Sequence, residues 1–167
     1  MNKIKVLVLM TVFIDIVGVG IIIPVLPYYI KSFGTSDVVV TLLVAVFALH
    51  SFVSAPMLGT LSDKIGRRPV LIGSIISTSI GWLIFAWAPS VIWLFIGRII
   101  DGLAAGNITT AQSSMADISP DDKTRASNMG LIGALFGIGF IVGPVIGGLL
   151  GSIGPTVPFW FVGILAG

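Results

Sequence analysis

Long uninterrupted runs of apolar residues dominate the sequence, and short polar segments separate them. Five runs are long, and they cover residues 6–30, 38–58, 70–88, 91–116 and 126–150. A sixth run begins near Val157 and stops at Gly167, about half the length needed to cross a bilayer. Each long run meets the requirement of about 20 apolar residues for a transmembrane helix. The runs lack the alternation of membrane β-strands, so the pattern predicts an all-α integral membrane protein.

The start of the chain, residues 1–5, also resembles the charged beginning of a secretory signal peptide. The apolar stretch that follows is too long for a signal peptide, however, and it contains Asp15. No small-residue cleavage site follows it. We therefore expect the first run to be a membrane span.

The composition agrees with a membrane protein, because 56% of the residues are hydrophobic and only 10% are charged. A soluble domain carries about 25% charged residues, so a water-soluble enzyme and a disordered chain are both disfavoured. The chain has no cysteine and one histidine, which argues against disulfides, thiol catalysis and a zinc cluster. A net charge of +2 does not suggest a nucleic-acid partner, and we expect no cofactor.

Basic residues predict the orientation in the membrane. If the amino terminus is cytoplasmic, the only basic residue in the outer segments is Lys31. The inner segments then hold seven, namely Lys3, Lys5, Lys64, Arg67, Arg68, Lys123 and Arg125. Such a bias marks the cytoplasmic side, and the interfacial aromatic residues agree because they fall near the outer surface. We therefore expect a multi-pass protein of the cell (plasma or inner) membrane with a cytoplasmic amino terminus.

Three charged residues lie inside the predicted spans: Asp15, Arg98 and Asp101. A charge at the bilayer centre costs roughly 2.5–3.5 kcal/mol on insertion scales, so each should face protein or a watery cavity. Helical rise places both aspartates ~14–15 Å deep, near the midplane. A buried ion pair that only joins two helices is one interpretation. We favour a proton-coupling group that lines a central cavity, because two acids against one base leave one acid in surplus.

The two aspartates have different sequence neighbours. Asp101 lies one turn from Arg98, and a nearby cation stabilises the charged carboxylate. Asp15 has apolar neighbours and no base on its own helix, so burial favours its protonated form. We therefore predict that Asp15 gains and loses the proton, unless Arg98 reaches it across a contact between the first and fourth spans.

A charged segment separates the second and third spans, and it contains Gly59, Asp63, Gly66, Arg67 and Arg68. The glycines allow a tight reversal between helices. Asp63 could accept hydrogen bonds from amides at a helix N-terminus, and the arginines could pair with Asp117. By composition alone, this segment is also an ordinary positively charged cytoplasmic loop.

Other polar residues within the spans are weaker candidates. His50, Ser51, Asn107 and Gln112 could line a substrate path, although a buried histidine is more often a packing residue. Aromatic side chains could offer a surface to a drug or simply pack, and these are Phe13, Phe47, Phe52 and Trp82.

The fifth span carries a stripe of small residues. Gly139, Gly143, Gly147 and Gly151 repeat every fourth residue, which lets a neighbouring helix approach closely. Pro144 removes one backbone hydrogen bond and favours a bend or swivel. Static packing and a moving hinge are both compatible with this stripe.

Four of these segments resemble motifs of the major facilitator superfamily. Residues 59–68 resemble its signature loop, and that loop also lies between the second and third spans. Residues 15–27 are similar to the first-helix motif of drug/proton antiporters, the branch that includes tetracycline pumps. Residues 97–102 are similar to the fourth-helix motif, whose arginine is implicated in proton transfer. The fifth-helix antiporter motif resembles the segment with Gly139, Gly143, Pro144, Gly147 and Gly148.

The resemblance implies the N-terminal six-helix bundle of a major facilitator fold, with the sixth helix truncated. It implies proton-coupled efflux of small amphipathic compounds or drugs across the lipid bilayer, by two bundles that rock around a midplane site. The partner would be a missing C-terminal half or a second copy of the chain. Ser51 and Gly81 stand where tetracycline pumps carry a glutamine and an acid, which argues against tetracycline itself. The alternatives are a passive channel subunit and a non-transporting membrane module.

Overall fold

The structure is a computed structural model that describes residues 3–167, and every regular element in that range is an α-helix. The first two residues of the signal-like start lie outside the described range. The helices are α1 (Lys3–Lys31), α2 (Asp37–Ile65), α3 (Arg67–Trp87), α4 (Val91–Ala105), α5 (Asn107–Asp117), α6 (Asp122–Ile153) and α7 (Val157–Ala166). Within this range five segments are long and apolar enough to cross a membrane, with α4 and α5 forming one of them. The all-α membrane architecture is confirmed.

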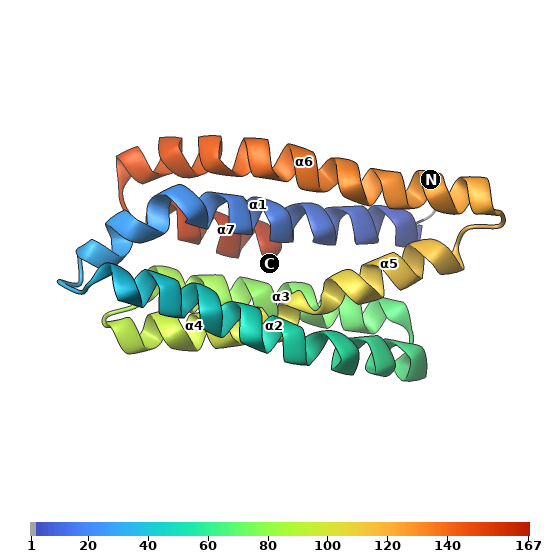
Figure 1. Cartoon of the computed structure of the whole chain (residues 1–167), viewed down its shortest axis with the longest axis horizontal. Helices are drawn as coiled ribbons and strands as arrows, with labels where there is room; N and C mark the ends of the chain where they lie inside the picture. Colours follow the sequence, from blue (N-terminus) through green and yellow to red (C-terminus); the bar gives the residue numbers. More distant parts are fainter. Residues whose placement is uncertain (1–2) are drawn as a thin grey trace.

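The helices lie side by side along the long axis of the molecule (Figure 1). The helix α1 packs along α6, whereas α3 packs along α4 and against α7. The short helix α5 contacts α2 and also reaches α1 and α6. At one end of the bundle, α5 therefore links α2 to the pair formed by α1 and α6.

Glycine residues, which have no side chain, allow α1 and α6 to approach each other closely. A Cβ atom on Gly143 would lie 2.7 Å from the Cα atom of Gly20, and one on Gly147 would lie 2.8 Å from the carbonyl oxygen of Ile21. Gly139 faces Ile16 in the same way, whereas Gly148 has open space around it. The small-residue stripe is thus a helix contact, and α6 continues without interruption through Pro144.

The helices α3 and α4 meet through another glycine pair. A Cβ atom on Gly97 would lie 2.8 Å from the carbonyl oxygen of Gly81. A Cβ atom on Gly81 would lie 3.0 Å from both the backbone nitrogen and the Cβ atom of Asp101. This contact holds the charged stretch of α4 directly against α3.

The connection between α2 and α3 is much shorter than the predicted loop of residues 59–69. The helix α2 continues to Ile65, and α3 begins at Arg67. Gly66 makes the whole reversal with a φ of 96°, a value that side chains disfavour and glycine tolerates. One residue with free φ suffices, so the charged signature segment is helical on both sides of Gly66.

The predicted fourth span is interrupted at Gly106, which separates α4 from α5. A Cβ atom on Gly106 would lie 2.6 Å from the backbone nitrogen of Ala55 in α2. Ser54 also donates a hydrogen bond to the carbonyl oxygen of Gly102 at 3.1 Å. The interruption therefore lies at a close contact with α2, which the apolar pattern does not reveal.

At the end of the bundle where α5 meets α6, the N-terminus of α6 is capped. The Asp121 carboxylate accepts a hydrogen bond from the Thr124 amide at 2.7 Å. That hydrogen bond lowers the pKa of Asp121. Nearby, the buried Asn128 accepts a hydrogen bond from the Lys5 ammonium and donates one to the Ser119 hydroxyl, each at 2.8 Å. These bonds join α1 to α6 and to the segment between α5 and α6.

Candidate functional site

A cavity of about 130 Å³ lies among α1, α2, α3, α4, α5 and α6. Its lining is mostly apolar and aromatic: Ile16, Val19, Phe47, Trp82, Ala105, Ile108, Phe136 and Phe140. Three polar side chains complete the lining, namely Asp15, Ser51 and Asp101. The structure therefore brings the two membrane-embedded aspartates from α1 and α4 to one cavity.

Asp15 is held by an amide rather than by a cation. The Nδ2 atom of Asn107 donates a hydrogen bond to the Oδ2 atom of Asp15 at 2.8 Å. Asn107 is the first residue of α5, and its side chain is fully buried. The buried Thr78 of α3 faces both Asp15 and Asp101, although its hydroxyl does not reach hydrogen-bond geometry.

Arg98 and Asp101 form a buried ion pair. The Nη1 atom of Arg98 lies 3.3 Å from the Oδ2 atom of Asp101, and their side chains are 4% and 8% exposed. The guanidinium also lies over three aromatic rings, with its carbon atom 4.6 Å from the Trp82 ring centre and 5.1 Å from those of Phe47 and Phe85. Such stacking stabilises a cation that has little water around it.

Arg98 pairs with Asp101 and not with Asp15. Within the described residues 3–167, its one ion pair is with Asp101, which lies one turn away on α4. The aromatic rings cover the guanidinium, and the Arg98 side chain is absent from the lining of the cavity. Asp15, at the same cavity, has a neutral hydrogen-bonding partner. The two aspartates thus have unlike electrostatic surroundings within one site.

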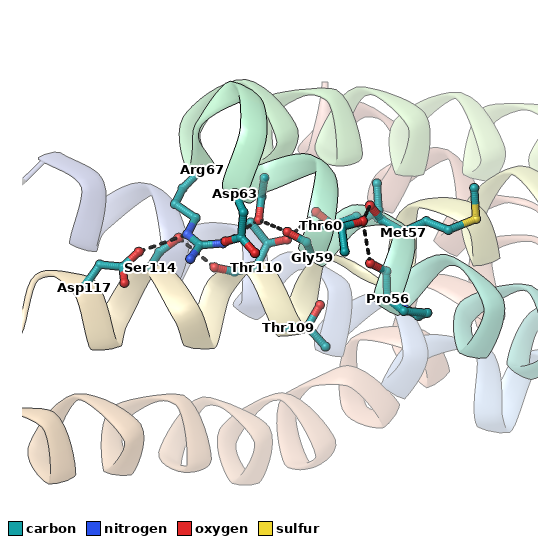
Figure 2. Close-up of polar contacts among 12 residues, drawn as sticks. Pro56, Met57, Gly59, Thr60, Asp63, Arg67, Thr109, Thr110, Ser114 and Asp117 are labelled. Atoms are coloured by element: carbon teal, nitrogen blue, oxygen red, sulfur yellow. Dashed lines mark hydrogen bonds and ion pairs between the residues drawn. The ribbon is translucent and has the colours of Figure 1, made fainter.

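A second charged cluster lies at the end of the bundle where α2 meets α3 (Figure 2). The Arg67 guanidinium lies between Asp63 of α2 and Asp117 of α5, at 2.5 Å and 2.9 Å. It also donates a hydrogen bond to the Ser62 hydroxyl at 2.6 Å. The sequence-based pairing of an arginine with Asp117 holds for Arg67, whereas the neighbouring Arg68 is exposed.

The hypothesis that Asp63 caps a helix is wrong. Gly66 occupies the N-cap position of α3, and no side chain accepts a hydrogen bond from the free amides there. Asp63 lies inside α2, one turn before Arg67, so its carboxylate is directed to the guanidinium instead. The reason is the one-residue reversal at Gly66, which leaves no loop that could place Asp63 at the start of α3.

The other candidate residues fall in different places. Ser51 lines the cavity, but the Nδ1 atom of His50 lies 2.7 Å from the carbonyl oxygen of Val46 one turn earlier in α2. Gln112 is exposed and does not border the cavity. Of the four aromatic candidates, Phe47 and Trp82 line the cavity, Phe13 packs against the apolar core, and Phe52 is 80% exposed.

Sequence reasoning missed several residues of this site. Thr78 gave no signal because a threonine in an apolar run is common and its orientation depends on the packing of α3. Phe136 and Phe140 lie one turn apart on α6, and their spacing could have suggested a shared face. In the described part of the chain, no group of three or more acidic, histidine or cysteine side chains is placed to hold a metal ion.

Comparison with known proteins identifies the family. Residues 8–167 match the Major Facilitator Superfamily, which is nearly the whole chain. The chain therefore belongs to the Major Facilitator Superfamily, as the four motifs predict.

Several curated proteins of this family are similar to the chain. It is 41% identical over 170 residues to the class C tetracycline resistance protein of Escherichia coli and 38% identical over 167 residues to the class H protein of Pasteurella multocida. It is 36% identical over 166 residues to the quinolone resistance protein NorA of Staphylococcus aureus. In each comparison the match covers 98–99% of the chain but only 42% of the relative, so the chain corresponds to the N-terminal half.

A solved structure confirms the fold. The chain superimposes on the crystal structure of the human organic anion transporter MFSD10 with a TM-score of 0.83 at 23% sequence identity. The match covers 99% of this chain and 45% of that transporter. The six predicted spans, with a short sixth helix, therefore form one half of a major facilitator fold.

Proposed function

We propose that the chain is the N-terminal half of a proton-driven efflux antiporter for small amphipathic drugs. The observation that carries this proposal is the unequal pair of carboxylates at one aromatic cavity. Asp101 is paired with Arg98, whereas Asp15 is bonded to a neutral amide. Asp15 can therefore change its protonation state without leaving a buried arginine unpaired.

The lining of the cavity supports an amphipathic substrate. Aromatic and aliphatic side chains form most of the surface, and the few polar groups include two acids. Ligand pockets commonly combine an apolar lining with a few polar groups that fix orientation. The names of the relatives concern resistance to tetracycline and to quinolones, which are small drugs with both polar and apolar parts. The complete cavity requires a C-terminal half or a second copy.

The test of this proposal is Asp15→Asn in the complete transporter, with Asp101→Asn as its companion. Asp15→Asn imitates the protonated acid, so it should insert and fold but lose at least about 100-fold of proton-driven drug uptake into inverted vesicles. Exchange of labelled drug down its own gradient should survive. Proton-driven uptake at the wild-type rate by Asp15→Asn would remove Asp15 from the coupling mechanism.

We further propose that the amino terminus is cytoplasmic, because the basic segments are at one end of the bundle. Trp87 and Trp93 lie in contact at the opposite end of α3 from Arg67, with ring centres 5.6 Å apart, as expected of an outer aromatic belt. The chain has no cysteine, so single cysteines introduced at positions 67, 123 and 31 report directly. An impermeant thiol reagent should label position 31 from outside intact cells and leave the other two unlabelled. Labelling at position 67 from outside would contradict this orientation.

A further inference from the structure

Asn107 occupies an unusual place for a polar residue. Its side chain has 0% exposure, and it follows directly after the interruption at Gly106. The amide donates to Asp15 at 2.8 Å, but its Oδ1 atom is buried and accepts no hydrogen bond from the described residues. A buried acceptor that remains unsatisfied is unfavourable, so its presence beside an ionisable group calls for an explanation.

We propose that Asn107 is a positioning residue that holds Asp15 in both of its protonation states. A side-chain amide carries donors and an acceptor on one planar group. When Asp15 is charged, the amide nitrogen donates to its carboxylate, which is the arrangement in the structure. When Asp15 carries a proton, a half-turn of the terminal amide presents Oδ1 to accept from the new hydroxyl. This inference rests on the proposed function, because it concerns the same proton.

The surroundings of Asp15 leave this role to Asn107. The charged groups near it belong to α4: Asp101, with Arg98 bonded to it. At the cavity, α2 contributes Phe47 and Ser51, and α6 contributes only phenylalanines. The helix α7 has no titratable side chain. The helix α3 presents Thr78, whose hydroxyl does not reach hydrogen-bond geometry, and the His50 ring contacts the backbone of its own helix, α2.

The backbone around Asn107 is fixed, which suits a side chain that turns in place. Gly106 lies so close to α2 that a Cβ atom there would be 2.6 Å from the Ala55 nitrogen. The Thr109 hydroxyl bonds to the carbonyl oxygen of Gly106 at 2.8 Å. The amide can therefore exchange its donor for its acceptor without a shift of α5. The link between α5 and α1 is then kept in both protonation states of Asp15.

The experiment is an infrared pH titration of the purified complete transporter. The absorption of the protonated carboxyl group is assigned to Asp15 by its loss in Asp15→Asn. Asn107→Leu keeps the size of the side chain but removes both hydrogen-bonding groups. The amide forms a stronger hydrogen bond with the charged carboxylate than with the protonated carboxyl group, so its removal favours the protonated form. The midpoint of the Asp15 titration should therefore move to higher pH by about one unit. Asn107→Ala, which cannot overpack the site, should move it in the same direction.

The matched control is Asn128→Leu. It removes a similarly buried asparagine, 2% exposed, which accepts a hydrogen bond from the Lys5 ammonium. It should leave the midpoint of the Asp15 band unchanged. Asn107→Gln, which restores the amide, should return the midpoint toward the wild-type value. An unchanged midpoint in both Asn107→Leu and Asn107→Ala, or an equal shift in Asn128→Leu, would refute the role of Asn107. Failure of the proposed function gives another pattern, in which Asp15→Asn transports normally while the Asn107 variants still shift the band.

Discussion

The molecule contains two clusters that each consist of one arginine and two aspartates. At the end of the bundle, Arg67 contacts both Asp63 and Asp117. At the cavity, Arg98 contacts Asp101, while Asp15 borders the same cavity and bonds to Asn107. The residue types are the same, but only the first cluster is a fully paired network.

Exposure accounts for the difference. The side chains of Arg67, Asp63 and Asp117 are 23%, 62% and 56% exposed, so the medium around them screens their charges. In the buried cluster, aromatic rings cover the guanidinium and little else is available to solvate the acids. An exposed cluster can lose one member at small cost, whereas a buried one cannot. The proposed proton coupling rests on the buried arrangement, in which Asp15 lies beside the ion pair without belonging to it.

The largest effect that separates the two clusters should come from Arg98→Met. This variant leaves the buried Asp101 carboxylate without its cation, which should lower the free energy of unfolding by about 3–5 kcal/mol. Unfolding of the purified protein in mixed micelles measures the change. The double variant Arg98→Met, Asp101→Leu removes both charges and should recover most of the loss.

That double variant also decides between charge and packing. If Arg98→Met and the double variant are equally unstable, the aromatic contacts of Arg98 rather than its ion pair hold the site together. If Arg98→Met alone is as stable as the wild type, the buried cluster behaves like the exposed one, and the comparison fails.

A second, smaller effect should come from Gly81→Ala. The added methyl group would lie 3.0 Å from the backbone nitrogen of Asp101, so α3 and α4 must separate slightly. We expect a loss of about 1–3 kcal/mol in the free energy of unfolding, a typical cost of overpacking. Gly73→Ala on the same helix is the control, because nothing lies within 4 Å of the added methyl group.

Stability of Gly81→Ala close to that of Gly73→Ala would show that the α3–α4 contact yields easily. The buried cluster would then owe its geometry to Arg98 and Asp101 alone. The tight contact at Gly81 leaves no room there for a larger side chain.

Much of this architecture could be predicted from sequence. Most ends of the predicted apolar runs fall within a few residues of a helix end. A bilayer imposes nearly the same length on every crossing, so run length is informative. Four motifs gave the family. Helical rise alone placed Asp15 and Asp101 at similar depth, and the structure brings both to one cavity.

The remaining features depend on contacts between helices. The interruption at Gly106 reflects the approach of α2, and a one-residue reversal at Gly66 replaces an expected loop. The hydrogen-bond partner of Asp15 also could not be predicted from the sequence pattern. Asn107 was a candidate for the substrate path, but its bond to Asp15 joins residues 92 positions apart in the chain. A pattern along one helix cannot show which side chain on another helix it meets.

The smallest effect should come from Arg67→Gln, which breaks the exposed cluster. We expect less than about 1 kcal/mol of lost stability, because exposed ion pairs contribute little. The loss should shrink further at high salt, since mobile ions screen exposed charges, whereas the effect of Arg98→Met should not depend on salt. Unfolding of both variants at low and high ionic strength tests this contrast. A large, salt-independent loss in Arg67→Gln would mean that Asp63 and Asp117 are shielded by a further part of the protein. The exposed cluster would then belong with the buried one as a fixed element of the fold.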